Sequence, residues 1–139
     1  MKIQVENLET VLDNIEDLFA FEELENSLRK ACLVIERSAK EKAPKDTGAL
    51  KRSIASKIDY TSEGLVGIVY SPLEYAPYVE YGTGLFAEDG GRKDVPWNYQ
   101  DDEGVWHSTS GQHPQPFMRP AFNENKEKVL RMIKEGFSK

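Results

Sequence analysis

The sequence predicts an α+β domain in which N-terminal helices and a C-terminal helix pack on one side of a small antiparallel sheet. Apolar residues recur at helical spacing in the first third of the chain and again near the C-terminus. Between these segments, two runs alternate with the period of a strand, and a glycine-rich insertion follows at about 84–114. Helices that flank a run of strands are typical of α+β folds. A chain of 139 residues fits a single domain, residues 1–139, with this insertion as a long loop or hairpin.

Two amphipathic stripes predict two N-terminal helices. The first stripe is Leu8, Val11, Leu12, Ile15, Leu18 and Phe19, and the second is Phe21, Leu24, Leu28, Cys32, Ile35 and Ala39. Polar residues fall where the first stripe would continue, so we expect a short helix, a break near Ala20 and a longer helix to about Lys42. Pro44 then ends the helix, because the residue before a proline is pushed out of the helical region. Cys32 is the only cysteine and is expected to be a buried, reduced thiol.

A β-hairpin is expected in the middle of the chain. Residues 54–60 and 65–70 both alternate with period 2, and the glycine-containing turn 61–64 joins them. The turn Asp46-Thr47-Gly48 precedes this hairpin, and we expect Asp46 or Thr47 to cap a brief helical turn.

Ten residues after the hairpin, Tyr75 to Gly84, combine three tyrosines, a proline and two glycines. Pro77 suits the first turn of a short helix, on which Tyr78 and Tyr81 would share a face. Gly82 is placed to end that helix with positive φ. The segment is interpreted either as a core corner that holds the sheet to a helix or as a contact surface for another chain.

The insertion is predicted to contain a second small hairpin. Trp97 and Tyr99 alternate, an acidic turn follows at 101–104, and Val105 and His107 alternate after it. This pattern places Trp97 and Trp106 on opposite faces of the hairpin.

The last helix is predicted to carry Pro120 in its first turn. Its expected apolar stripe is Phe122, Val129, Leu130, Ile133 and Phe137.

The chain carries few signs of catalytic chemistry. His107 and His113 lie near the acidic residues 101–103, so a small metal-dependent hydrolase that uses both histidines stays open as an alternative. The serines lack the glycine-framed elbow of a nucleophile, and Gly82-x-Gly84 is too short for a dinucleotide fingerprint. We therefore expect no enzymatic activity, no cofactor and no metal.

Aromatic side chains instead indicate a protein-interaction surface, since aromatics dominate interface hot spots. The candidate interface residues are Trp97, Tyr99, Trp106, Tyr78 and Tyr81. The formal net charge of −6 argues against unspecific attraction to DNA. No apolar run approaches the roughly 18 residues that span a bilayer. We expect neither specific nucleic-acid binding nor membrane insertion, and a monomeric module that binds a peptide at the tyrosines is a further alternative.

Three segments in this order resemble one protein family: APKDTGALKRSI at 43–54, YAPYVEYGTG at 75–84 and PFMRPAF at 116–122. They are similar to the head-tail joining or tail-completion (minor tail) proteins of long-tailed bacteriophages and prophages, typified by the gene-10 product of a lambdoid phage. The resemblance covers the chain from about Leu8 to Phe137.

The resemblance implies an α+β fold, no catalysis, and a structural subunit that closes into a homo-oligomeric ring, of which a hexamer is one form. The implied partners are other copies of the chain, the tail tube or tail terminator protein, and the head connector protein. The implied location is the virion tail at the head-tail interface, after assembly in the host cytoplasm. The motif residues implied to be structural are Asp46, Thr47 and Gly48 at the start of the sheet, Glu80, Gly82 and Thr83 before the variable arm, and Arg119 and Pro120 at the start of the last helix.

Overall fold

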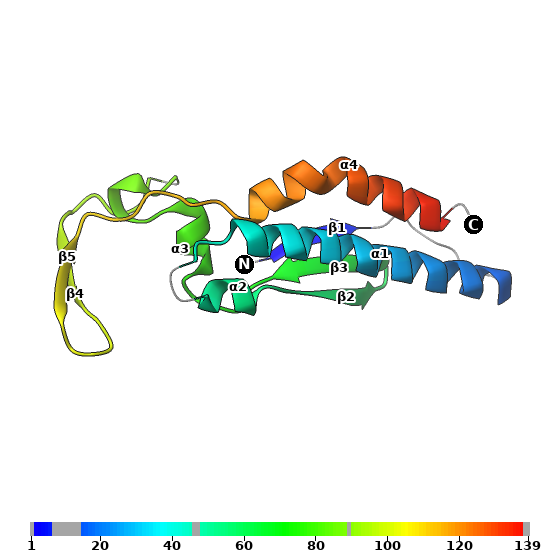
Figure 1. The fold of residues 1–139 in the computed structure, drawn as a ribbon, viewed down its shortest axis with the longest axis horizontal. Coiled ribbons are helices and arrows are strands. Elements are labelled where there is room, and N and C mark those ends of the chain that lie inside the picture. The colour runs from blue at the N-terminus through cyan, green and yellow to red at the C-terminus, as the bar shows by residue number, and fades with distance from the viewer. Residues whose placement is uncertain (1, 7–14, 46–47, 89, 138–139) are drawn as a thin grey trace. The chain divides into compact units, whose positions relative to one another are not determined.

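The chain forms two compact units, the second inserted into the first (Figure 1). The computed structural model describes residues 2–6, 15–45, 48–88 and 90–137. Unit 1 comprises residues up to Pro72 and from Phe117 onward, and unit 2 comprises Leu73–Pro116. Unit 2 is larger than the expected insertion at 84–114, because it also contains the tyrosine segment. The grouping of all 139 residues into one domain stays a prediction.

The elements confirm the predicted α+β class. Unit 1 contains β1 (Lys2–Glu6), α1 (Ile15–Lys42), α2 (Ala49–Ser53), β2 (Ala55–Thr61), β3 (Gly64–Tyr70) and α4 (Met118–Phe137). Unit 2 contains α3 (Ala76–Tyr81), the 3-10 helix η1 (Gly84–Phe86), β4 (Trp97–Gln100) and β5 (Trp106–Thr109).

Unit 1 is built on a three-stranded antiparallel sheet with the strand order β1-β3-β2. The predicted hairpin is confirmed as β2 and β3, with Ala55 opposite Tyr70 and Thr61 opposite Gly64. The edge strand β1 was not predicted. It pairs with the free edge of β3, where Val5 lies opposite Gly67. Five residues at the start of a chain are a weak period-2 signal, and only the partner strand makes them a strand.

Helix α1 runs without interruption from Ile15 to Lys42, so the expected break near Ala20 is wrong. No proline or glycine occurs within this span, and a rotation of the polar face alone does not interrupt the backbone hydrogen bonds. The part of the expected first helix from Leu8 to Asn14 lies outside the described residues. The buried positions of α1 and the residue after it are Leu24, Leu28, Ala31, Cys32, Ile35, Ala39 and Ala43.

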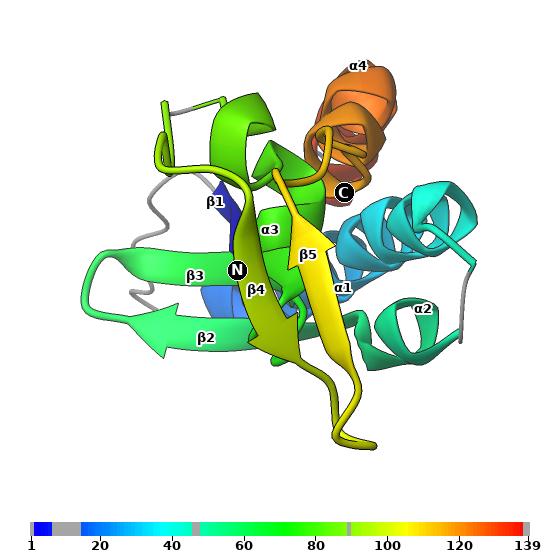
Figure 2. The same cartoon turned by 90° about the vertical axis from the view of Figure 1, so that its left-hand side faces the viewer.

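The two long helices lie together on one side of the sheet, as Figure 2 shows. Helix α1 crosses β3 at Gly67, where a Cβ atom would overlap the Sγ atom of Cys32 and lie 3.2 Å from Cδ1 of Leu28. Helix α4 packs along α1, and Gly136 leaves no room for a side chain against Ser27. Glycine on β3 and α4 thus permits close approach of neighbouring elements.

Helix α4 begins as expected, with Pro120 in its first turn. One position of the predicted stripe is wrong, since Leu130 is 47% exposed while its neighbour Val129 is buried. The buried face of α4 instead continues from Met118 and Ala121, and consecutive helical residues point about 100° apart. The side chain of Phe137 lies outside the described part of the structure. In the described residues, none of the helices has the length and apolar character that a membrane span requires.

Candidate protein-interaction site

The tyrosine segment folds as the sequence predicts. Pro77 lies in the first turn of α3, and Gly82 ends the helix with a φ of 81°. The amide of Gly82 donates to the carbonyl of Tyr78 over 2.9 Å. Tyr78 and Tyr81 therefore project from one face of α3, and they are 59% and 40% exposed.

The returning end of unit 2 is hydrogen-bonded to the segment that follows α3. The amide of Thr83 donates to the carbonyl of Gln112, and the amide of Gln112 donates to the hydroxyl of Thr83, each over 2.9 Å. The amide of Gln115 also donates to the carbonyl of Val79 over 2.7 Å. Gly84 and Gly111 allow this approach, because a Cβ atom on either would overlap the opposing backbone. These contacts close unit 2 into a loop whose two ends lie side by side.

An apolar groove of about 810 Å³ lies in unit 2. Its walls include Pro77, Tyr78 and Tyr81 from α3 and Trp97 from β4. Arg92 and Glu88 supply charged groups to the lining. The structure thus brings three of the five predicted interface residues, Tyr78, Tyr81 and Trp97, to a single groove. Their part in an interface stays a prediction.

Arg92 fixes the tryptophan wall of the groove. Its guanidinium lies over the Trp97 ring, 4.7 Å from the ring centroid. The same guanidinium donates two hydrogen bonds to Asp94, from Nε over 2.9 Å and from Nη2 over 3.1 Å. These bonds hold the pKa of the Asp94 carboxyl below its usual value. A cation held by a fork of two bonds is a well-oriented partner for an aromatic face.

The predicted second hairpin is confirmed as β4 and β5. Tyr99 lies opposite His107, and Gln100 lies opposite Trp106. Residues opposite one another share a face, so Trp97 and Tyr99 lie on one face and Trp106 lies on the other. The predicted placement of the two tryptophans on opposite faces is therefore correct. Trp106 is 68% exposed, the largest fraction of any large apolar side chain among the residues whose burial is described.

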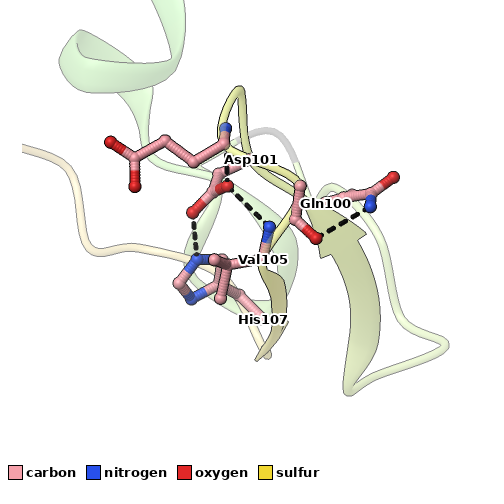
Figure 3. A network of polar contacts seen from close by, with 6 residues as sticks. Gln100, Asp101, Val105 and His107 are labelled. Atoms are coloured by element: carbon pink, nitrogen blue, oxygen red, sulfur yellow. Dashed lines mark hydrogen bonds and ion pairs between the residues drawn. The ribbon is translucent and has the colours of Figure 1, made fainter.

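Asp101 organises the tip of this hairpin (Figure 3). Its Oδ1 atom accepts hydrogen bonds from the amides of Glu103 and Val105, each over 2.9 Å. Its Oδ2 atom lies 2.7 Å from Nε2 of His107. The bond with His107, followed by those from the two amides, lowers the pKa of the Asp101 carboxyl. Gln100 adds a bond from Nε2 to the carbonyl of Gly104 over 2.8 Å. The tip is thus a hydrogen-bonded turn that holds β4 and β5 in register.

The two histidines have different neighbours. His107 stacks on Tyr99 with 5.2 Å between ring centroids, and it bonds to Asp101. The ring of His113 lies 3.9 Å from that of Phe86. In the described ranges, no three His, Cys, Asp or Glu side chains converge as a metal site.

Several residues with an implied structural role can be placed. Glu80 is fully buried on α3, and it has an interaction partner. Gly48 precedes α2 with a φ of 75° and provides no side-chain cap. The predicted capping residues Asp46 and Thr47 lie outside the described residues. Arg119 is half-buried in the first turn of α4.

Sequence reasoning missed Arg92 and Asp94, which form the contact that orients Trp97. The sequence offered one signal for this contact, an arginine and an aspartate two residues apart shortly before Pro96, but such a pair is common in loops. The contact of Phe86 with His113 had no local signal, because the two residues are far apart in the chain.

The comparison with protein families identifies the class of this protein. Residues 6–82 match the family model described as "Bacteriophage HK97-gp10, putative tail-component", and the match covers more than half of the 139 residues. The protein is therefore a bacteriophage tail component by family. In particular, the chain belongs to the HK97-gp10-like family, as the sequence motifs indicated. No match was found among curated proteins or among solved structures.

The family match ends at Gly82. It includes β2, β3 and α3, and thus the tyrosine wall of the groove. Trp97, the β4–β5 hairpin and α4 lie beyond the matched residues. The family match therefore says nothing about the role of the hairpin.

Proposed function

We propose that this protein is a non-enzymatic subunit that joins tail to head in a phage or prophage particle. It assembles as a homo-oligomeric ring at the head-proximal end of the tail. Membership in a tail-component family supports a structural role. The ring and its position on the virion are the proposed part.

One observation carries the proposal: the exposed apolar side chains gather in the inserted unit. Where burial is described, eleven large apolar side chains are exposed, and eight of them belong to unit 2. These eight are Tyr75, Tyr78, Tyr81, Leu85, Phe86, Tyr99, Val105 and Trp106. Clustered exposed apolar surface marks interaction sites, because a monomer gains nothing from leaving it in water. Unit 1 supplies the buried core, and unit 2 supplies surface for partners.

The proposed partners are neighbouring copies, the tail tube or tail terminator protein, and the head connector protein. The net charge of −6 per chain fits a ring whose inner wall repels DNA and lets it pass. The ring is placed in the virion tail at the head-tail interface.

Deletion of the gene from the phage or prophage that encodes it tests the proposal. Electron microscopy of the lysate should find filled heads and free tails that do not join. Joined particles should return when the wild-type gene is supplied on a plasmid. Normal yields of infectious particles from the deletion strain would contradict the proposal, and defective heads or absent tails would place the protein at a different step.

A further inference from the structure

We propose that the β4–β5 hairpin of one subunit docks with Trp106 in the apolar groove of the neighbouring subunit. The groove is the one lined by Tyr78, Tyr81 and Trp97. This contact rests on the proposed homo-oligomer and names the surfaces that form it.

The hairpin has the properties of an inserting element. Trp106 is 68% exposed, and Val105 beside it is 50% exposed. Burial of one tryptophan removes roughly 150–250 Å² from water, which makes such a side chain a strong anchor. The bonds of Asp101 already fix the hairpin tip. Little conformational freedom is therefore lost when the hairpin docks.

The groove of the same chain is a poor place for this tryptophan. Trp97 lines the groove, and Trp106 leaves the hairpin from the opposite face. Trp106 could reach its own groove only if the hairpin turned over, which would remove Trp97 from the wall. A second copy offers the same groove without this conflict.

The charged groups that are not engaged within the described residues have opposite signs at the two surfaces, while Glu88 in the groove lining has an interaction partner of its own. Asp102 and Glu103 at the hairpin tip are exposed and form no ion pair with a described residue. Lys93 is exposed next to Arg92 at the groove and likewise forms no ion pair in the described part of the chain. Arg92 itself is engaged by Asp94. Lys93 is thus available to attract the acidic tip of a neighbour, which would orient the hairpin as it approaches.

The contact joins two different surfaces of the subunit. The hairpin and the groove are different surfaces, so a subunit can donate its hairpin to one neighbour and accept a hairpin from another. A head-to-tail contact of this kind closes into a ring if the rotation between subunits permits it, whereas reciprocal exchange between two chains would give a two-fold dimer.

Cross-linking of chains that each carry one added cysteine tests the contact directly. One full-length chain carries Tyr78→Cys in the groove, and a second carries Val105→Cys on the hairpin. Cys32 is buried, and burial raises its pKa to about 11, so it should not react. A flexible bismaleimide added to a mixture of the two chains should give mixed dimers. Leu33→Cys, on an exposed position of α1 in unit 1, replaces Tyr78→Cys in the matched control and should give none.

Measurement of the wild-type oligomer in the same buffer separates this contact from the proposed ring. Mixed dimers support the contact whether or not a closed oligomer forms, and an absence of closed oligomers would then count against the ring alone. A closed oligomer without mixed dimers would overturn the contact and leave the ring standing. Absence of both would overturn the contact as well.

Association of substituted chains gives a second, quantitative test. Trp106→Ala should weaken association about 100-fold, which at 1.4 kcal/mol per tenfold is about 2.8 kcal/mol. Leu33→Ala, which removes an exposed apolar side chain from unit 1, should change it less than about 3-fold, or about 0.7 kcal/mol. Lys93→Glu should weaken association, and Glu103→Lys on the same chain should restore it. Equal effects of Trp106→Ala and Leu33→Ala, or no recovery in the charge-exchanged chain, would overturn the proposal.

Discussion

The close crossing of α1 over β3 at Gly67 should make the stability of the protein sensitive to a side chain at this position. A Cβ atom at Gly67 would overlap the Sγ atom of Cys32 and approach Leu28 to 3.2 Å. Cys32 and Leu28 are both fully buried, so neither can turn toward water. Gly67→Ala should therefore lower the free energy of unfolding by about 2 kcal/mol, within the range for overpacked cores. This net value allows for a small stabilising effect of Gly67→Ala, because alanine lowers the conformational entropy of the unfolded chain.

Cys32→Ala is the matched partner in a double-mutant cycle. Alone, it removes one buried atom and should cost about 1 kcal/mol. In the double variant, the new methyl group at residue 67 fills part of the space left by the sulfur, so the loss should stay near 1 kcal/mol and the coupling should be about 2 kcal/mol.

Urea unfolding followed by circular dichroism measures all four proteins. With a slope of roughly 2 kcal/mol per molar urea, Gly67→Ala should shift the midpoint by about 1 M. A double variant that loses the sum of the two single losses would refute the crossing, since it would mean that residues 67 and 32 do not touch.

Three further results are expected. Cys32 should react with a thiol reagent at least about 100-fold more slowly in the native protein than in urea, because burial raises its pKa from 9.0 to about 11; equal rates would contradict its burial. The pKa of the Asp101 carboxyl, measured by NMR, should lie below its usual value, and His107→Ala should raise it. The contribution of Asp101 to hairpin stability should therefore be present above about pH 4 and lost as the pH falls through the lowered pKa. Tyr60→Phe removes the hydroxyl that donates to Glu25 over 2.5 Å and lowers the pKa of the Glu25 carboxyl. The substitution should therefore destabilise the protein at pH values above that pKa, and its effect should fade as the pH falls below it. An effect of the substitution that grows at low pH would contradict this assignment.

Local patterns predicted most of the fold. The hairpin of β2 and β3, the short helix α3 and the end of α1 before Pro44 each depend on residues close in sequence. The edge strand β1 was missed because its pairing with β3 is long-range. The break expected near Ala20 was wrong because a shift of the apolar face does not by itself interrupt the backbone hydrogen bonds of a helix.

The site was predictable only in part. Period-2 alternation predicted Trp97 and Trp106 on opposite faces of the hairpin, and the register that pairs Gln100 with Trp106 confirms it. The groove could not be predicted, because it exists only when Thr83 and Gln112 pair across the insertion and bring α3 close to Trp97. Sequence spacing does not encode such a closure.

Native mass across a wide concentration range tests the central claim, assembly through unit 2, most directly. The wild-type protein should give one discrete species at an integer multiple of 15.8 kDa that does not grow as concentration rises. A Trp97→Ala, Trp106→Ala double variant should give the monomer. A wild-type monomer at every concentration, or an open ladder of sizes that the double variant leaves unchanged, would contradict the account.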